Sequence, residues 1–149
     1  MKRHRALVGL SHDHHEILLL ARLLKSAHDS AARCHSAKRF LPGLRAHFSV
    51  EERALAFVLG AGHTKLNEQV QDTIRCHREL ETAIARLPCA SVAHDDLRTV
   101  GTELVEYVRG QERELFQQMQ RMLSADVFAS IAECVDLERD IAACRFTAP

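Results

Sequence analysis

Excess charge is missing from this chain of 149 residues, because 20 basic residues balance 20 acidic ones. A protein without a positive field does not attract nucleic acid or anionic lipid electrostatically. Long apolar runs are missing too. The run at 6–10, which follows a basic start, is too short for a signal peptide or a membrane span. We therefore expect a cytoplasmic protein that binds neither nucleic acid nor a membrane.

Paired-cysteine motifs are also absent. The five cysteines are an odd number and include no C-x-x-C pair, which argues against a zinc ribbon and against a disulfide framework. We expect them to be small, half-buried apolar residues in a reducing compartment. Hydrolytic chemistry has no support either, since no Ser-His-Asp order, phosphate-binding loop or catalytic acid pair is found.

Strand-like alternation is absent, and helical periodicity takes its place almost throughout the chain. Ser11 and Thr64 are residue types that cap helices, and glycines at 60 and 62 should end the second helix. Pro42 should shift the start of that helix or bend its first turns. The predicted helices span about 11–30, 36–59, 64–87, 95–123 and 124–145.

These helices predict a single all-α domain covering residues 1–149. Long helices with short connections favour an antiparallel up-down-up-down four-helix bundle, here at about 11–123, with a short fifth helix at the C-terminus. The fifth helix is amphipathic. We expect it to lie across the bundle, and the alternative is that it pairs with a second chain in a homodimer.

Histidine is the most unusual feature of the composition, with ten in 149 residues. Each of the first three helices places one within an otherwise apolar stripe: His14, His47 and His77. Burying an unpartnered imidazole costs about 1–3 kcal/mol, so three on apolar faces are hard to explain as core residues alone. Glu51 follows His47 by one helical turn, and such a pair can grip one metal ion.

The remaining histidines are weaker candidates. His15 competes with His14 for the first helix, but its face is more peripheral. We expect the others to be solvated: His4, His12, His28, His35, His63 and His94.

Four segments carry a resemblance to the hemerythrin-like, or HHE cation-binding, domains. They are Leu-Ser-His-Asp-His-His-Glu at 10–16, His47-x-x-x-Glu51, Cys-His-Arg-Glu-Leu at 76–80, and Tyr107-x-x-x-Gln111-Glu112. The resemblance spans residues 8–123. It implies a four-helix bundle around a non-haem di-iron centre that binds or senses O2, NO or iron, or consumes peroxide.

The resemblance also implies the ligands. A bridging carboxylate and three imidazoles would come from the first three helices, as Glu51, His14, His47 and His77. On the fourth helix the family usually has His-x-x-x-Glu followed by another acid. This sequence has Tyr107, Gln111 and Glu112 there instead.

These changes differ in their chemistry. Tyr107 can bind Fe(III) as a phenolate once the metal displaces its proton, whereas Gln111 is a weak neutral ligand. Glu112 could replace it, but it lies about 100° further around the helix and needs a locally distorted turn. In the alternative, Tyr107 and Gln111 only fill and hydrogen-bond the core.

We therefore predict a mononuclear site, or a di-metal site with unequal halves. Mixed oxygen and nitrogen donors favour Fe or Mn over Zn. Three functions stay open at this point: a sensor or carrier of O2, NO or iron, an enzyme that decomposes peroxide at an open metal position, and a metal-free interaction scaffold.

Overall fold

A computed structural model describes residues 2–146 of the chain, with side chains for residues 2–139. All regular elements in this part are helical, which confirms the predicted all-α class, and no helix in it is long and apolar enough to cross a bilayer. The elements are α1 (Arg5–Lys25), α2 (Ser30–Gly60), α3 (Thr64–Arg86), α4 (His94–Gly110), the π-helical turn η1 (Gln111–Leu115), α5 (Phe116–Met122) and α6 (Ala125–Phe146).

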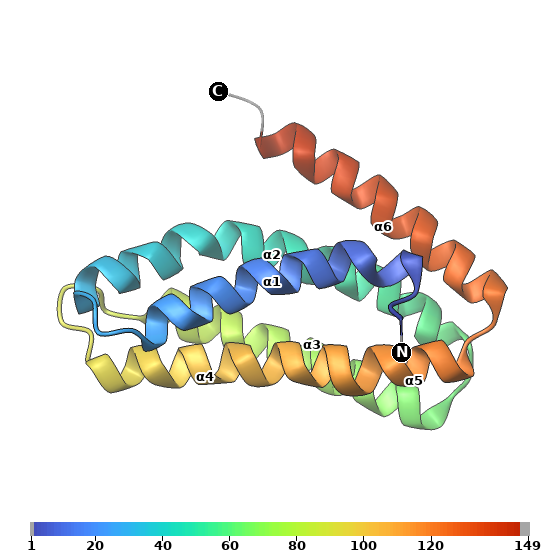
Figure 1. Ribbon diagram of the computed structural model, residues 1–149, viewed down its shortest axis with the longest axis horizontal. Helices are drawn as coiled ribbons and strands as arrows, with labels where there is room; N and C mark the ends of the chain where they lie inside the picture. The colour runs from blue at the N-terminus through green and yellow to red at the C-terminus, as the bar shows by residue number, and fades with distance from the viewer. Residues whose placement is uncertain (1, 147–149) are drawn as a thin grey trace.

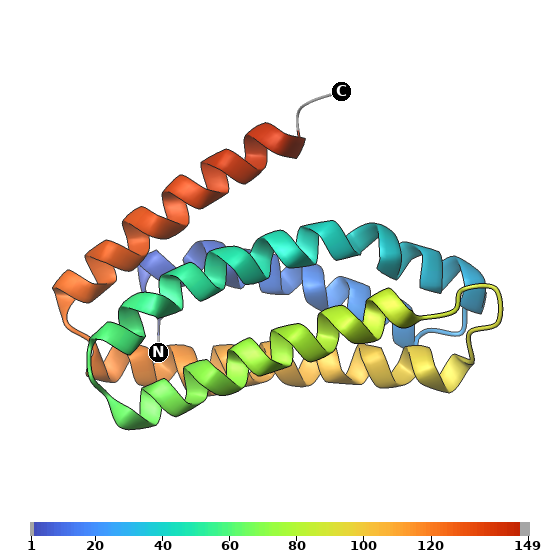
Figure 2. The ribbon, with the colours of Figure 1, turned by 180° about the vertical axis from the view of Figure 1, so that it is seen from behind.

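The first three helices and the continuous rod of α4, η1 and α5 lie lengthwise beside one another (Figure 1). The α1–α2 and α3–α4 connections lie at one end, and the α2–α3 and α5–α6 connections lie at the other, as the reverse view also shows (Figure 2). α6 packs on α1 and α2, and its far end leaves the bundle at an angle (Figure 1).

Two predicted helix starts were wrong. The first helix begins at Arg5 rather than Ser11, because the Nδ1 atom of His4 accepts a hydrogen bond from the Ala6 amide and so caps it. The second begins at Ser30, where the carboxylate of Asp29 accepts a hydrogen bond from an amide of the first turn, at 2.8 Å.

The predicted end of the first helix was wrong too, since α1 ends at Lys25 rather than at about residue 30. The boundaries around the α2–α3 connection agree with the sequence. α2 ends at Gly60, and Gly62 adopts a positive φ of 77°, a conformation that glycine reaches without a steric cost. α3 begins at Thr64 as predicted, although the capping position is the preceding residue, which makes no side-chain capping bond.

The apolar core consists of two clusters, one in each half of the bundle. One is built around Ile17, Leu44 and Leu104, and the other around Leu10 and Val70, with apolar residues of α6 against it. A layer of buried polar side chains lies between these clusters along α1 and α2. The candidate site is therefore surrounded by apolar packing.

Cys34 and Cys89 form a disulfide, so the prediction that the cysteines are unpaired was wrong for these two. They lie 55 residues apart in sequence, and they meet because the start of α2 and the α3–α4 connection share one end of the bundle. Sequence spacing carries no signal of that meeting. Cys76 and Cys134 are free thiols, and Cys144 lies outside the residues whose side chains are described.

Candidate metal centre

The buried polar layer combines side chains from every helix of the bundle. Its acid, Glu51, and the imidazole of His77 are each 0% exposed, and no other member is more than 5% exposed. The members are His14 of α1, His47 and Glu51 of α2, His77 of α3, Tyr107 of α4 and Gln111 of η1. Five of the six predicted ligands thus lie together in the core.

Glu51 is the hub of this layer. Its Oε2 atom accepts hydrogen bonds from the Tyr107 hydroxyl at 2.6 Å and from Nε2 of His77 at 2.8 Å. Its Oε1 atom lies 3.7 Å from Nε2 of His14, and neither of these two atoms has a hydrogen-bond partner among the described residues. His47 places its Nε2 atom 4.0 Å from Oε2 and 3.0 Å from the Tyr107 hydroxyl.

The other ring nitrogen of each imidazole, Nδ1, donates a hydrogen bond to a carboxylate at the edge of the layer. The three pairs are His14 with Glu112 at 2.7 Å, His47 with Asp13 at 3.2 Å, and His77 with Glu52 at 2.8 Å. The three carboxylates in turn form ion pairs with Arg3, Arg139 and Arg78, in the same order. Carboxylates in this position orient imidazoles that bind metal ions.

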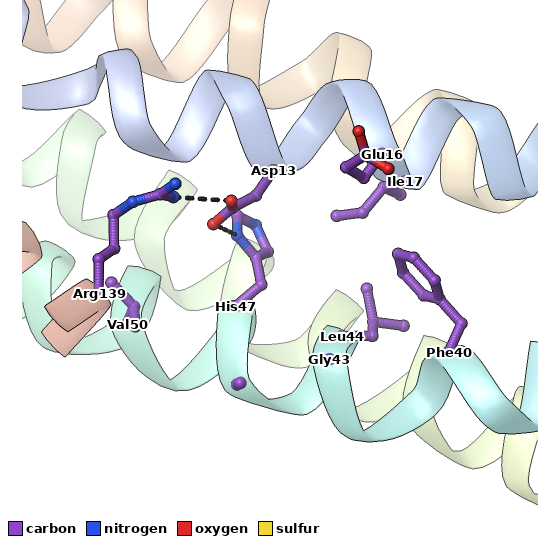
Figure 3. Close-up of a pocket in the computed structure, with 10 residues that line it drawn as sticks. Asp13, Glu16, Ile17, Phe40, Gly43, Leu44, His47, Val50 and Arg139 are labelled. Carbon is purple, nitrogen blue, oxygen red and sulfur yellow. Dashed lines mark hydrogen bonds and ion pairs between the residues drawn. The ribbon is translucent and has the colours of Figure 1, made fainter. Parts of the chain in front are cut away.

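One of these chains of contacts reaches α6. Asp13 lies between His47 and Arg139 and contacts both, as the dashed lines in Figure 3 show. Arg139 also donates a hydrogen bond to the carbonyl of Gly9 at 2.7 Å. Asp13, His47 and Arg139 line a pocket of about 330 Å³ between α1 and α2, together with apolar side chains such as Ile17. This pocket faces the Asp13 side of His47.

Charge in the centre follows from these contacts. Burial disfavours the imidazolium of His14, but the hydrogen bond to Glu112, the Glu51 carboxylate 3.7 Å away and the charges of both acids outweigh it, and the pKa of His14 rises to about 9. Burial likewise raises the pKa of Glu51, yet the close approach of His14, the hydrogen bond with His77 and the positive charge of nearby imidazoles hold it well below its usual value. Glu51 is therefore an anion.

Tyr107 is shifted in the opposite direction. Burial, the negative charge of Glu51 and the hydrogen bond to that carboxylate all raise the pKa of the phenol well above its usual value of 10. In the absence of a metal ion, Tyr107 is a neutral hydrogen-bond donor to Glu51. The phenolate considered from the sequence forms only if a bound cation offsets all three effects.

The arrangement requires positive charge between the imidazoles and Glu51. A neutral imidazole that donates its Nδ1 proton outward keeps a bare lone pair on Nε2. All three Nε2 atoms lie within 4.0 Å of a Glu51 oxygen, where a lone pair would repel the carboxylate. The 2.8 Å bond from His77 to Glu51 therefore requires a proton on its Nε2 as well as on its Nδ1. Either additional protons or a metal ion must lie there.

The donor atoms fit one metal ion. His14, His47 and Glu51 each offer an atom within 4.8 Å of the other two, and all three residues are buried. The orphaned atoms named above, Nε2 of His14 and Oε1 of Glu51, belong to this group. Two imidazoles and one carboxylate form the donor set of many non-haem Fe(II) sites.

His77 and Tyr107 form the other half of the layer, and both are already hydrogen-bonded to Oε2 of Glu51. The ring of His77 also stacks on Phe48, with centroids 4.0 Å apart. A second ion here would have to displace two hydrogen bonds to one oxygen. The two halves of the centre thus differ in the donor atoms that are available to a cation.

η1 lies where the sequence required a distorted turn. The amide of Phe116 donates to the carbonyl of Gln111, five residues earlier, and this widens the helix by one residue. Glu112 does not face Glu51 from this turn. It accepts hydrogen bonds from Nδ1 of His14 and from the hydroxyl of Ser11, on the far side of the His14 ring.

Sequence reasoning did not identify Asp13 and Glu52 as parts of the centre. The sequence feature that could have identified them is that each is next to a candidate ligand: Asp13 precedes one and Glu52 follows another. Of the histidines expected in solvent, His12, His28, His35 and His94 are exposed, as is the rival His15, whereas His4 and His63 are half-buried.

Comparisons with models of protein families, with curated proteins and with solved structures found no match for this chain.

Proposed function

We propose that this protein is a hemerythrin-like, non-haem iron protein that binds or senses O2, NO or iron, with an up-down-up-down bundle as its scaffold. The observation that carries the proposal is the common orientation of three buried imidazoles. In each, Nδ1 donates a hydrogen bond to a carboxylate and Nε2 points toward Glu51. Hydrogen bonding within a metal-free core would not require this orientation three times, whereas metal ligation does.

His14, His47 and Glu51 would hold the tighter ion, and His77 with Tyr107 would complete a second, weaker position around the shared carboxylate. A bound Fe(II) ion supplies coordination positions that small diatomic ligands can occupy. The chain surrounds these positions with apolar side chains, because Phe116 stacks near His14 and Phe48 stacks on His77. Asp13, Glu52 and Glu112 keep the three imidazoles in one tautomer.

Anaerobic titration of metal-free protein with Fe(II), followed by desalting and metal analysis, tests the proposal. We expect at least one retained ion per chain, a rise in thermal stability, and loss of both in His14→Ala and His47→Ala. His15→Ala is the matched control, because His15 is exposed on the same helix. It should retain the ion.

Small-ligand binding is the second part of the test. Addition of NO or O2 to the loaded protein should change its visible spectrum. Rapid turnover of peroxide that disappears in His47→Ala would instead favour the enzyme alternative. No retained metal, with thermal stability unchanged by a chelator, would leave only the metal-free scaffold.

A further inference from the structure

Two adjoining hollows lie between α3 and the α4–η1 segment, on a different pair of helices from the pocket in Figure 3. Their volumes are about 570 and 210 Å³. Cys76, Glu106 and Tyr107 line both of them, so the two hollows meet at these side chains. Tyr107 places them beside the centre, because its hydroxyl contacts Glu51 at 2.6 Å.

The larger hollow is acidic. Its charged lining residues in the described part of the chain are Glu79, Glu103 and Glu106, with no lysine or arginine there. Among the described side chains, none of these three acids forms an ion pair. Burial, and then the negative charges of Glu106 and Glu79, raise the pKa of Glu103, because the three carboxylates line one hollow. Unpaired acids grouped in a chain of zero net charge attract cations.

The smaller hollow is lined by Gln111, whose side-chain oxygen has no hydrogen-bond partner among the described residues. Gln111 is 5% exposed, and its Nε2 atom donates to the Thr73 hydroxyl at 2.8 Å. That hydroxyl gives its own proton to the carbonyl of Gln69, so it can only accept from Gln111, and this settles which end of the amide faces it. The Oε1 atom of Gln111 is left without a hydrogen bond from any side chain or backbone group that the structure describes. A carbonyl oxygen can be satisfied by a donor or by a cation.

The pocket in Figure 3 is less suited to a cation. Arg139 stands at its rim, and the charge of Asp13 is already matched there by Arg139 and His47. The α3–α4 side therefore offers unpaired negative charge at its mouth and an unused oxygen further in.

We propose that a divalent cation reaches the buried centre through the α3–α4 hollow, where Glu79, Glu103 and Glu106 collect it and Oε1 of Gln111 binds it before it passes Tyr107. The proposal rests on the proposed function, because it presupposes a centre that binds metal. It adds the side from which the ion arrives and the groups that set the rate of loading.

Stopped-flow mixing of the metal-free protein with substoichiometric Co(II) tests this route, with the visible bands of cobalt as the signal for arrival at the centre. The triple variant Glu79→Gln/Glu103→Gln/Glu106→Gln should load about tenfold more slowly at low ionic strength, with the same final absorbance. The difference should shrink in about 0.5 M salt, because salt screens exposed charges. Gln111→Met should also load more slowly, with its helicity checked by circular dichroism.

The matched control carries the same change in net charge elsewhere on the surface. Glu68, Glu133 and Asp136 are exposed acids outside the two hollows, and their neutralisation to Gln, Gln and Asn should leave the rate unchanged. Equal slowing in both triple variants would mean that net charge alone sets the rate, and this would overturn the route.

A wild-type loading rate in the triple variant of Glu79, Glu103 and Glu106 would also overturn the route, but it would not contradict the proposal that the centre binds metal. Failure of the wild-type protein to bind Co(II) at all would overturn the proposed function together with it. A second readout does not depend on the centre. Mn(II) should broaden the amide resonances of Glu103 and Glu106 before those of the control acids, and uniform broadening would contradict collection at the hollow.

Discussion

Substitution of Glu112 tests whether this carboxylate positions His14 or binds metal directly. Its Oε1 atom lies 2.7 Å from Nδ1 of His14 and 2.6 Å from the hydroxyl of Ser11. Glu112→Gln keeps an acceptor but removes the charge, and the difference between a charge-assisted and a neutral hydrogen bond is about 1 kcal/mol. The Kd for Fe(II) should therefore rise about fivefold.

Glu112→Ala removes the acceptor as well. Loss of a carboxylate that orients a metal-binding imidazole costs about 10–100-fold in affinity. We expect the lower end of that range, because the side chain of Glu112 is 25% exposed and water can take its place beside His14. Competition with a chelator of known affinity, under anaerobic conditions, measures both values, and Glu68→Ala serves as an exposed-acid control.

Two results would refute this reasoning. Complete loss of the ion in Glu112→Ala, equal to that in His14→Ala, would mean that Glu112 binds the metal directly, as the sequence alone permits. Unchanged affinity in Glu112→Ala would mean that the contact with His14 has no influence on the centre.

Three further predictions concern the metal-free protein. Tyr107→Phe leaves the buried Glu51 with one hydrogen bond fewer, so urea denaturation should show a loss of about 1–3 kcal/mol, and an unchanged midpoint would contradict the hub role. The pKa of His14 is raised from 6.5 to about 9, so its imidazolium stabilises the fold below pH 6.5 and this contribution disappears as the pH rises through 9. Unfolding at a series of pH values should therefore show a fall of about 3 kcal/mol between pH 6 and 10, whereas His14→Gln should show a flatter profile. Gly101→Ala should destabilise by about 1–3 kcal/mol in thermal unfolding, because the added Cβ would lie 2.9 Å from a carbonyl oxygen of α1. Gly60→Ala, with open space around it, should not destabilise in this way.

The helical fold was largely predictable, and the errors have identifiable causes. Ser11 is a good capping residue by type, but it lies within α1 and its hydroxyl donates a hydrogen bond to Glu112 instead. His4 caps that helix in its place, and histidine is not a usual capping residue. Pro42 lies inside α2, although its type indicated a boundary or bend near that position. Packing along the bundle outweighed these local preferences.

The candidate site was predictable where helical periodicity alone decides direction. His47 and Glu51 lie four residues apart on one face of α2, so their meeting follows from the helix itself. The direction of Glu112 depends on η1, a local change of helical pitch that periodicity does not report. The position of the Asp13 carboxylate depends on its ion pair with Arg139, which comes from a helix outside the bundle.

By itself, the sequence determined an all-helical chain and an apolar stripe on each of three helices with a histidine in it, because side-chain spacing along a helix is a local property. Only the tertiary structure decided that the three imidazoles meet at Glu51 and that each turns Nδ1 outward to an acid. It also decided that Cys34 bonds to Cys89 and that unpaired acids gather between α3 and α4. These features depend on which helix faces are brought together, and on the balance of burial and charge where they meet.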